Sequence, residues 1–182
     1  MAPVMRHRLI PLLGLLLLVF AGPAPAAAPQ EWQSHDYKVV RVVDGDTFVA
    51  SDGNIQFWVR IAGMDAPEKG QPYSKLATTR LKKRINGKYV KLKPLKRGTD
   101  RYKRVLAHVY WDGGDVALLM IQEGLATYYR PKCRDYPADK NSYSFDPQIY
   151  LDAEAQAKAA KKHLWSEQLE LPCHYRQRMR KK

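Results

Sequence analysis

The chain has 182 residues, with 31 lysines and arginines against 18 aspartates and glutamates, which gives a formal net charge of +13. This length fits one compact domain with tails. Two cysteines exclude a framework of several disulfides, and the absence of zinc-finger spacing around them argues against a zinc site. Solubility alone would explain a basic surplus, but basic residues interleaved with aromatic ones favour a nucleic-acid partner.

The first residues have the pattern of an export signal. Arg6 and Arg8 precede an apolar run over Leu9–Phe20 that is too short to span a bilayer, and small residues follow at Ala24–Ala26. We therefore expect four segments: a signal peptide over 1–26, a linker over 27–36, a folded domain over 37–168 and a basic tail over 169–182. The mature protein is expected to be secreted or periplasmic, without stable membrane association, and monomeric.

The domain begins with residues that favour strands and tight turns. Lys38–Val43 and Thr47–Ser51 are predicted strands, and Ser51–Asn54 is a hairpin signal. Apolar and polar residues then alternate over 55–62, which predicts a third strand with one face in the core. The period of two places Ile55 on the core face and Arg60 on the opposite face, near the strand's end.

The rest of the domain is predicted to contain helices as well as strands. The expected elements are, in chain order, a helix over Ser74–Ile85 capped by Ser74, strands over Tyr89–Lys93 and Val105–Trp111, a helix over Val116–Glu123 capped by Asp115, and a helix that begins at Pro147 after the cap Asp146. This order predicts an α+β fold, an OB-fold five-stranded β-barrel with three α-helices, and such barrels often bind nucleic acids.

Two clusters of carboxylates interrupt this basic chain. The first is Asp44–Thr47, where Asp44 itself is expected to form the turn, and the second is Asp65–Glu68, with Arg60 just ahead of it. Carboxylates repel an anionic polymer unless a hard cation lies between them, whereas arginines bind phosphate. Together, a cation, arginines that bind phosphate and a further carboxylate that activates water indicate phosphodiester cleavage.

Five motifs between about Lys38 and Glu167 carry a resemblance to one family. They are VVDGDTF, VRIAGMDAPE, TDRYKRVLAHVY, EGLATYY and EAQAKAAKKHLWSE. In this order they resemble the staphylococcal nuclease, or thermonuclease, family. The resemblance implies a calcium-dependent endonuclease with an OB-fold core, which cleaves DNA and RNA with low sequence specificity and leaves 3′-phosphates.

The same resemblance implies the residues that hold the cation and activate water. Asp46 and Asp65 match the carboxylate ligands of Ca²⁺, and Ala66 matches a ligand that acts through its backbone carbonyl. The family commonly has threonine at the position of Ala66, and loss of the hydroxyl leaves that carbonyl in place. Glu68 matches the proposed general base.

The residues that would contact the substrate follow from the resemblance in the same way. Arg60 and Arg104 match the two phosphate-binding arginines. Tyr102 matches a ring that lines the nucleotide pocket, and Asp100 borders that pocket. Its second tyrosine is either Tyr128 or Tyr129, because the spacing in this chain differs from that of the family.

The two cysteines, Cys133 and Cys173, permit one internal pairing. Since an exported protein enters an oxidising compartment, we expect them to form a disulfide.

Two other functions compete with the nuclease. One is a catalytically inactive OB module that only binds nucleic acid, and the other is a domain that binds a protein partner in the same groove. A module that only binds gains nothing from three carboxylates beside phosphate, and nothing specific supports a protein partner.

Overall fold

The computed structural model describes residues 36–112, 114–130, 133 and 147–181. The predicted signal peptide, the linker up to residue 35 and the predicted cap Asp146 lie outside the described residues. Within the described ranges no helix is long and apolar enough to cross a membrane.

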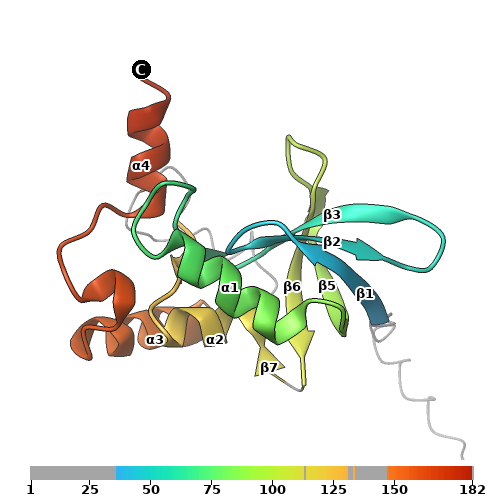
Figure 1. Cartoon of the computed structure of the whole chain (residues 1–182), viewed down its shortest axis with the longest axis horizontal. Helices are drawn as coiled ribbons and strands as arrows, with labels where there is room; N and C mark the ends of the chain where they lie inside the picture. Colours follow the sequence, from blue (N-terminus) through green and yellow to red (C-terminus); the bar gives the residue numbers. More distant parts are fainter. Residues whose placement is uncertain (1–35, 113, 131–132, 134–146, 182) are drawn as a thin grey trace, which may run out of the picture. The chain divides into compact units, whose positions relative to one another are not determined.

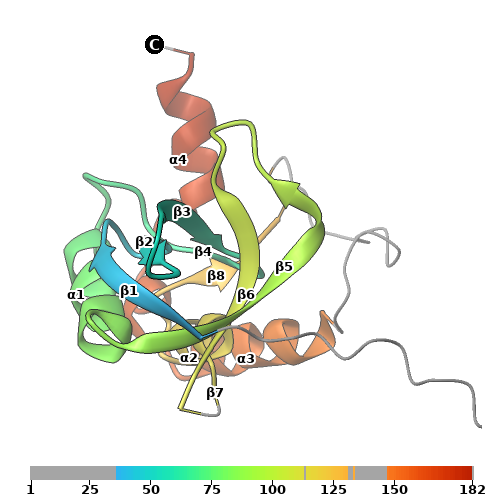
Figure 2. The same cartoon turned by 90° about the vertical axis from the view of Figure 1, so that its right-hand side faces the viewer.

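Five strands close into a barrel, as Figures 1 and 2 show. Their order is β3-β2-β1-β5-β6; β3 and β6 pair in parallel and close the ring, and the other pairs are antiparallel. The strands are β1 (Asp36–Val42), β2 (Thr47–Ser51), β3 (Gln56–Ile61), β5 (Tyr89–Thr99) and β6 (Val105–Trp111). This confirms the predicted α+β class and the OB-fold barrel.

Short strands and helices cover the barrel. A two-stranded sheet joins β4 (Met64–Asp65) to β8 (Thr127–Tyr128), and β7 (Gly114–Asp115) extends the barrel sheet beyond β6. The α-helices in the described part are α1 (Ser74–Ile85), α2 (Val116–Gln122), α3 (Gln148–Ala159) and α4 (Pro172–Met179), with a 3₁₀ turn at His163–Trp165. Three α-helices were expected, and α4 is the addition.

The apolar core fills the barrel and the space beneath the helices. Phe48 and Val59 from the barrel, Leu81 from α1, Met120 from α2 and Tyr150 from α3 are all fully buried. In Figure 2, α2 and α3 lie side by side below the barrel, and α1 covers its flank. Polar side chains lie instead at the end of the barrel where β2 begins, β3 ends and β6 begins.

Several local predictions were wrong. Ile55, expected in the core, is 61% exposed, because β3 begins only at Gln56 and pairs there with the end of β2. The cap of α1 is Tyr73, in the left-handed region at φ 63°, whereas Ser74 is the first helical residue. Pro147 is the cap of α3 rather than its first residue. The predicted cap Asp115 is confirmed, since its side chain accepts from the Leu118 N–H at 3.0 Å.

A buried carboxylate joins α3 to the strands behind the acidic clusters. Glu154, 2% exposed, accepts from the Tyr128 N–H at 2.8 Å and from Arg130 at 2.9 and 3.1 Å, and it pairs with Lys158 at 2.6 Å. Burial alone would raise the pKa of Glu154, but the hydrogen bonds from Arg130 and Lys158 outweigh it and lower that pKa below its ordinary value. Because Tyr128 is in β8, Glu154 also fixes the strand that pairs with Asp65.

Replacing Glu154 by alanine should lower the free energy of unfolding at neutral pH by about 3–5 kcal/mol, since one partner of a buried pair is removed. A carboxylate with a depressed pKa in the fold stabilises at pH values above its unfolded pKa, and that stabilisation is lost as the pH falls. The gap between wild type and Glu154→Ala should therefore narrow below about pH 4.3.

Urea unfolding at pH 7 and at pH 3.5 measures both effects. The exposed Glu167→Ala is the control and should change little. Equal losses of unfolding free energy in the two variants at pH 7 would contradict the stabilising role of Glu154.

Candidate active site

The carboxylate of Asp46 ties the first acidic cluster to the second. Its Oδ1 accepts from the Thr47 hydroxyl and its Oδ2 from the Ala66 N–H, both at 3.0 Å. The Asp46 N–H in turn donates to Asp44 Oδ1 at 3.0 Å, so Asp44 forms the turn as expected. Residues 20 positions apart in the chain are therefore held together at one end of the barrel.

Gly45 allows this close approach. A Cβ atom at this position would lie 2.6 Å from the Cβ of Ala66 and 3.0 Å from that of Ala77 in α1. Backbone approach this tight excludes any side chain. The glycine between the two aspartates of the DGDT motif is thus a packing requirement of the site.

Arg60 lies between the two aspartates that the resemblance assigns to the cation. Its Nη1 is 2.7 Å from Asp46 Oδ2, and its Nη2 donates to Asp65 Oδ1 at 2.9 Å. Arg60 is only 8% exposed and Asp65 2%. Arg60 lies on the face opposite the core residues Val59 and Ile61, as predicted, and reaches the acidic residues. Its burial was not predicted: barrel closure covers the end of β3, and the two carboxylates replace the hydration of the guanidinium.

The site carries more negative charge than Arg60 offsets. Burial, together with the neighbouring charge of Asp46, raises the pKa of Asp44 to about 6. Burial likewise raises the pKa of Asp65, although Arg176 and Arg60 oppose the shift. Carboxylates packed this closely favour the binding of a further cation.

The second predicted phosphate-binding arginine lies next to this cluster. Arg104 donates from Nε to Asp100 Oδ2 at 2.8 Å and from Nη1 to the Thr47 hydroxyl oxygen at 3.2 Å. Asp100 Oδ1 accepts from the backbone N–H groups of Tyr102 and Arg104, which fixes the turn. Tyr102 is 62% exposed, and the guanidinium of Arg104 lies 5.4 Å from its ring centroid. The partly buried Arg104 side chain thus lies beside an exposed ring.

Glu68 is the most accessible of the predicted site carboxylates, with 37% of its side chain exposed. Its backbone N–H donates to Gln71 Oε1 at 2.9 Å, and Gln71 Nε2 donates to the Glu170 carbonyl at 2.8 Å. Water can therefore reach Glu68, while its backbone is held in place.

The sequence left open whether Tyr128 or Tyr129 contacts the nucleotide, and the two side chains differ in exposure. Tyr128 is 2% exposed, and its ring stacks on Tyr150 at 6.1 Å between centroids. Such a ring lies in the core and offers no open face to a base. Tyr129 is partly exposed and is the remaining candidate.

One site residue was missed. Arg176, in α4, donates from Nη1 to Asp65 Oδ1 at 2.8 Å, from Nη2 to Asp65 Oδ2 at 2.7 Å and from Nη1 to Glu68 Oε1 at 2.5 Å. The sequence predicted a basic tail here. Pro172 at the first helical position, followed by ten residues without glycine or proline, was the signal for a helix.

The acidic cluster fits a hard divalent cation by its chemistry. Its donors are oxygens only, from Asp46, Asp65 and the backbone of Ala66, and Ca²⁺ prefers such ligands completed by water. Among the described residues, no three acidic side chains bring ligand oxygens within 4.8 Å of one another. Arg60 and Arg176 contact these carboxylates instead.

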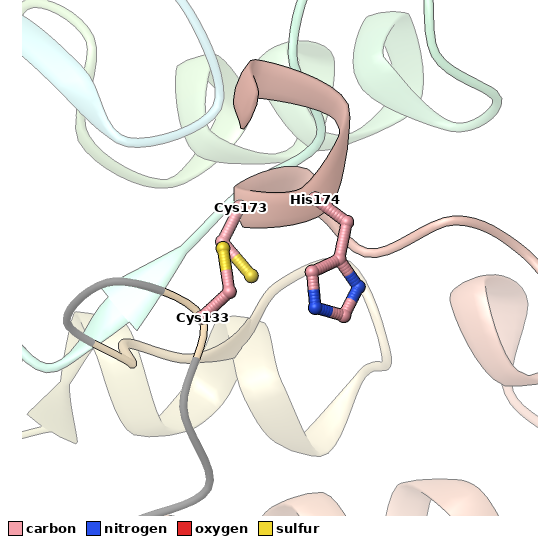
Figure 3. A group of neighbouring side chains, drawn as sticks. All are labelled: Cys133, Cys173 and His174. Atoms are coloured by element: carbon pink, nitrogen blue, oxygen red, sulfur yellow. The ribbon is translucent and has the colours of Figure 1, made fainter. Parts of the chain in front are cut away.

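A different donor set lies at the start of α4 (Figure 3). Cys133 Sγ, Cys173 Sγ and a ring nitrogen of His174 all lie within 4.8 Å of one another. Both cysteines are free in the structure, so the predicted disulfide is not confirmed, but the two side chains do meet. Cys173 is buried, and burial raises the pKa of its thiol to about 12.

The structure thus combines an OB barrel with buried carboxylates and two arginines at one end. Residues 58–167 match the model of the family described as staphylococcal nuclease homologue, and the chain belongs to this family. It is 35% identical over 157 residues to an uncharacterized endonuclease of Haemophilus influenzae, covering 86% of this chain and 78% of the relative.

Two further relatives are of similar length. A thermonuclease of Staphylococcus hyicus is 32% identical over 162 residues, covering 85% of this chain and 89% of the relative. An uncharacterized endonuclease of Escherichia coli is 33% identical over 154 residues, covering 84% and 88%. The similarity therefore extends over most of each protein.

Arg60→Met should lower the free energy of unfolding by about 3–5 kcal/mol in EGTA, because it leaves two buried carboxylates without their shared counter-charge. Excess calcium should recover part of this loss, since a ligand that binds only the folded state stabilises it.

Urea unfolding with EGTA and with calcium measures the difference. Arg104→Met is the matched control, because its pair with Asp100 is more exposed and its loss should be smaller. If Arg60→Met is no less stable than Arg104→Met in EGTA, the central place of Arg60 is contradicted.

Proposed function

We propose that the chain is an exported, calcium-dependent endonuclease that hydrolyses phosphodiester bonds of DNA and RNA with low sequence specificity and leaves 3′-phosphates. The observation that carries the proposal is the meeting of Asp46, Arg60 and Asp65 at one end of the barrel, within a cluster that also contains Glu68. The names of the related proteins, endonuclease and thermonuclease, support it.

The carboxylates of Asp46 and Asp65 and the carbonyl of Ala66 would hold the ion. When bound, the cation would offset negative charge on the phosphate. Glu68 is accessible to water and would orient a water molecule and accept its proton, a role typically worth about 10²–10⁴-fold in rate.

The arginines would bind the phosphate. Arg60 and Arg104 both lie at the barrel end, on either side of Thr47: Thr47 pairs with Arg60 across β2 and β3, and its hydroxyl accepts from Arg104. Guanidinium groups donate pairs of hydrogen bonds to phosphate oxygens, and these strengthen as charge develops in the transition state. Their donors would replace water around the reacting group.

Low sequence specificity follows from how the substrate would be held. Tyr102 offers an exposed ring, which stacks on any base, and Arg101 lies 4.8 Å from that ring's centroid. The net charge of +13 attracts the backbone of either nucleic acid. Neither stacking nor backbone attraction distinguishes DNA from RNA or one base sequence from another.

Glu68→Gln should lower turnover by on the order of 10²-fold or more with little change in substrate binding, because glutamine keeps the size but cannot accept the proton.

Cleavage of DNA and RNA by the wild type should stop in EGTA and EDTA and return with calcium, while the binding of nucleic acid remains.

A surface variant, Lys93→Ala, is the control: it should weaken binding slightly and keep turnover. Undiminished cleavage in the chelators would contradict the dependence on a cation. Binding of nucleic acid without cleavage under any condition would favour the inactive binding module.

Export, as a secreted or periplasmic monomer without stable membrane association, is part of the proposal. It rests on the signal-like residues 1–26 and on the cysteine pair, whose side chains meet although 40 residues separate them. A thiol–disulfide oxidant in the exported compartment would take two electrons and two protons from Cys133 and Cys173 and leave a disulfide.

Thiol titration of the exported, denatured and unreduced protein should find no free thiol, and reduction should release two per chain. In the chain-entropy model such a bond contributes about 4 kcal/mol to stability. Two free thiols without reduction would contradict the disulfide, and metal analysis would then show whether the two sulfurs and His174 hold a soft metal instead.

A further inference from the structure

Helix α4 brings a charged side chain into the site from outside the region that matches the family. The match ends at residue 167, and α4 spans Pro172–Met179. Its Arg176 is 29% exposed at the side chain, whereas its partner Asp65 is 2% exposed. The pair is therefore largely buried on the acidic side and reaches solvent on the basic side.

The contacts of Arg176 occupy the oxygens that the proposed chemistry requires. Arg176 takes both oxygens of Asp65, at 2.8 and 2.7 Å, and Asp65 Oδ1 is at the same time 2.9 Å from Arg60. Its Nη1 also holds Glu68 at 2.5 Å. An expected cation ligand and the expected base are thus both bound by one guanidinium.

A divalent ion and this guanidinium cannot share the carboxylates at low cost. Asp65 has two oxygens, and hydrogen bonds from two arginines already occupy them. Like charges a few ångströms apart repel strongly where water is largely excluded, and a divalent ion doubles the repulsion that a single charge would exert. Binding of the ion therefore requires Arg176 to leave Asp65.

The start of α4 is fixed more firmly than the Arg176 side chain. Cys173, one helical turn before Arg176, is buried beside Cys133 (Figure 3). Gln71 is hydrogen-bonded to the Glu170 carbonyl just ahead of the helix, and the Tyr175 hydroxyl donates to the Lys69 carbonyl at 3.4 Å. The long side chain of Arg176 can therefore rotate away while the helix remains.

We propose that Arg176 is an internal competitor of the cation: it neutralises Asp65 and Glu68 in the cation-free protein, and calcium binds by displacing it. This inference rests on the proposed function. It makes Arg176 a residue that sets the calcium concentration at which the site forms, and it keeps the carboxylates from repelling nucleic acid or each other before the ion arrives.

The test is calcium binding measured by isothermal titration calorimetry without nucleic acid. Arg176→Met keeps the apolar stem and removes the charge. If Arg176 occupies the carboxylates for about nine-tenths of the time, its removal should tighten calcium binding about tenfold. Arg176→Lys should be intermediate, because one ammonium group cannot hold both Asp65 oxygens and Glu68 together.

Arg178→Met is the matched control on the same helix, since Arg178 pairs with the exposed Glu170. It should bind calcium like the wild type. Thermal unfolding supplies a second reading: Arg176→Met should unfold at a lower temperature than wild type in EGTA, and the difference should shrink in saturating calcium.

The outcomes separate this inference from the proposed function. Tighter calcium binding by Arg176→Met, with Arg178→Met unchanged, supports the competition. If the wild type binds calcium and Arg176→Met binds it no more tightly, the competition is overturned and the proposed function stands. If wild type and Arg176→Met both fail to bind calcium, the cation site itself is wrong and the proposed function falls with it.

Discussion

The buried guanidinium of Arg60, held between Asp46 and Asp65, is the interaction on which the site depends. It joins the turn after β1 to the short strand β4, and the pairing of β3 with both β2 and β6 places it at the barrel end. Removing any of these three charges would leave a buried partner with less counter-charge, which is more costly than loss of a surface pair. The charged site is therefore part of the closed end of the barrel.

The same electrostatic problem would make arginines and the proposed cation alternatives at this site. Four carboxylates, Asp44, Asp46, Asp65 and Glu68, gather near one another and repel unless positive charge lies among them. Arg60 is part of the barrel and stays in place, whereas the counter-charge on Asp65 and Glu68 comes from α4 through Arg176. Under the proposed function, stability without the ion and affinity for the ion would be opposed, because both would use the same carboxylate oxygens.

The sequence predicted the features that depend on local pattern. It did not predict the contacts that form only when the barrel closes. The strands, the OB barrel, the Asp115 cap and the pairing of the two acidic turns follow from periodicity, turn residues and family motifs. The burial of Arg60 does not, since alternation assigns a face but cannot tell that carboxylates 14 residues before it and 5 after it will surround that face. Tyr128 and Tyr129 could be separated only once Tyr150 was seen to pack on Tyr128. Arg176 was missed because its partner lies 111 residues away.

A crystal structure with calcium and a nucleotide that bears a 3′-phosphate tests the central claim most directly. We expect calcium on Asp46 and Asp65, the phosphate on Arg60 and Arg104, and the Arg176 guanidinium moved off Asp65 while α4 stays in place. Calcium bound elsewhere, with Arg176 still on both oxygens of Asp65, would contradict it.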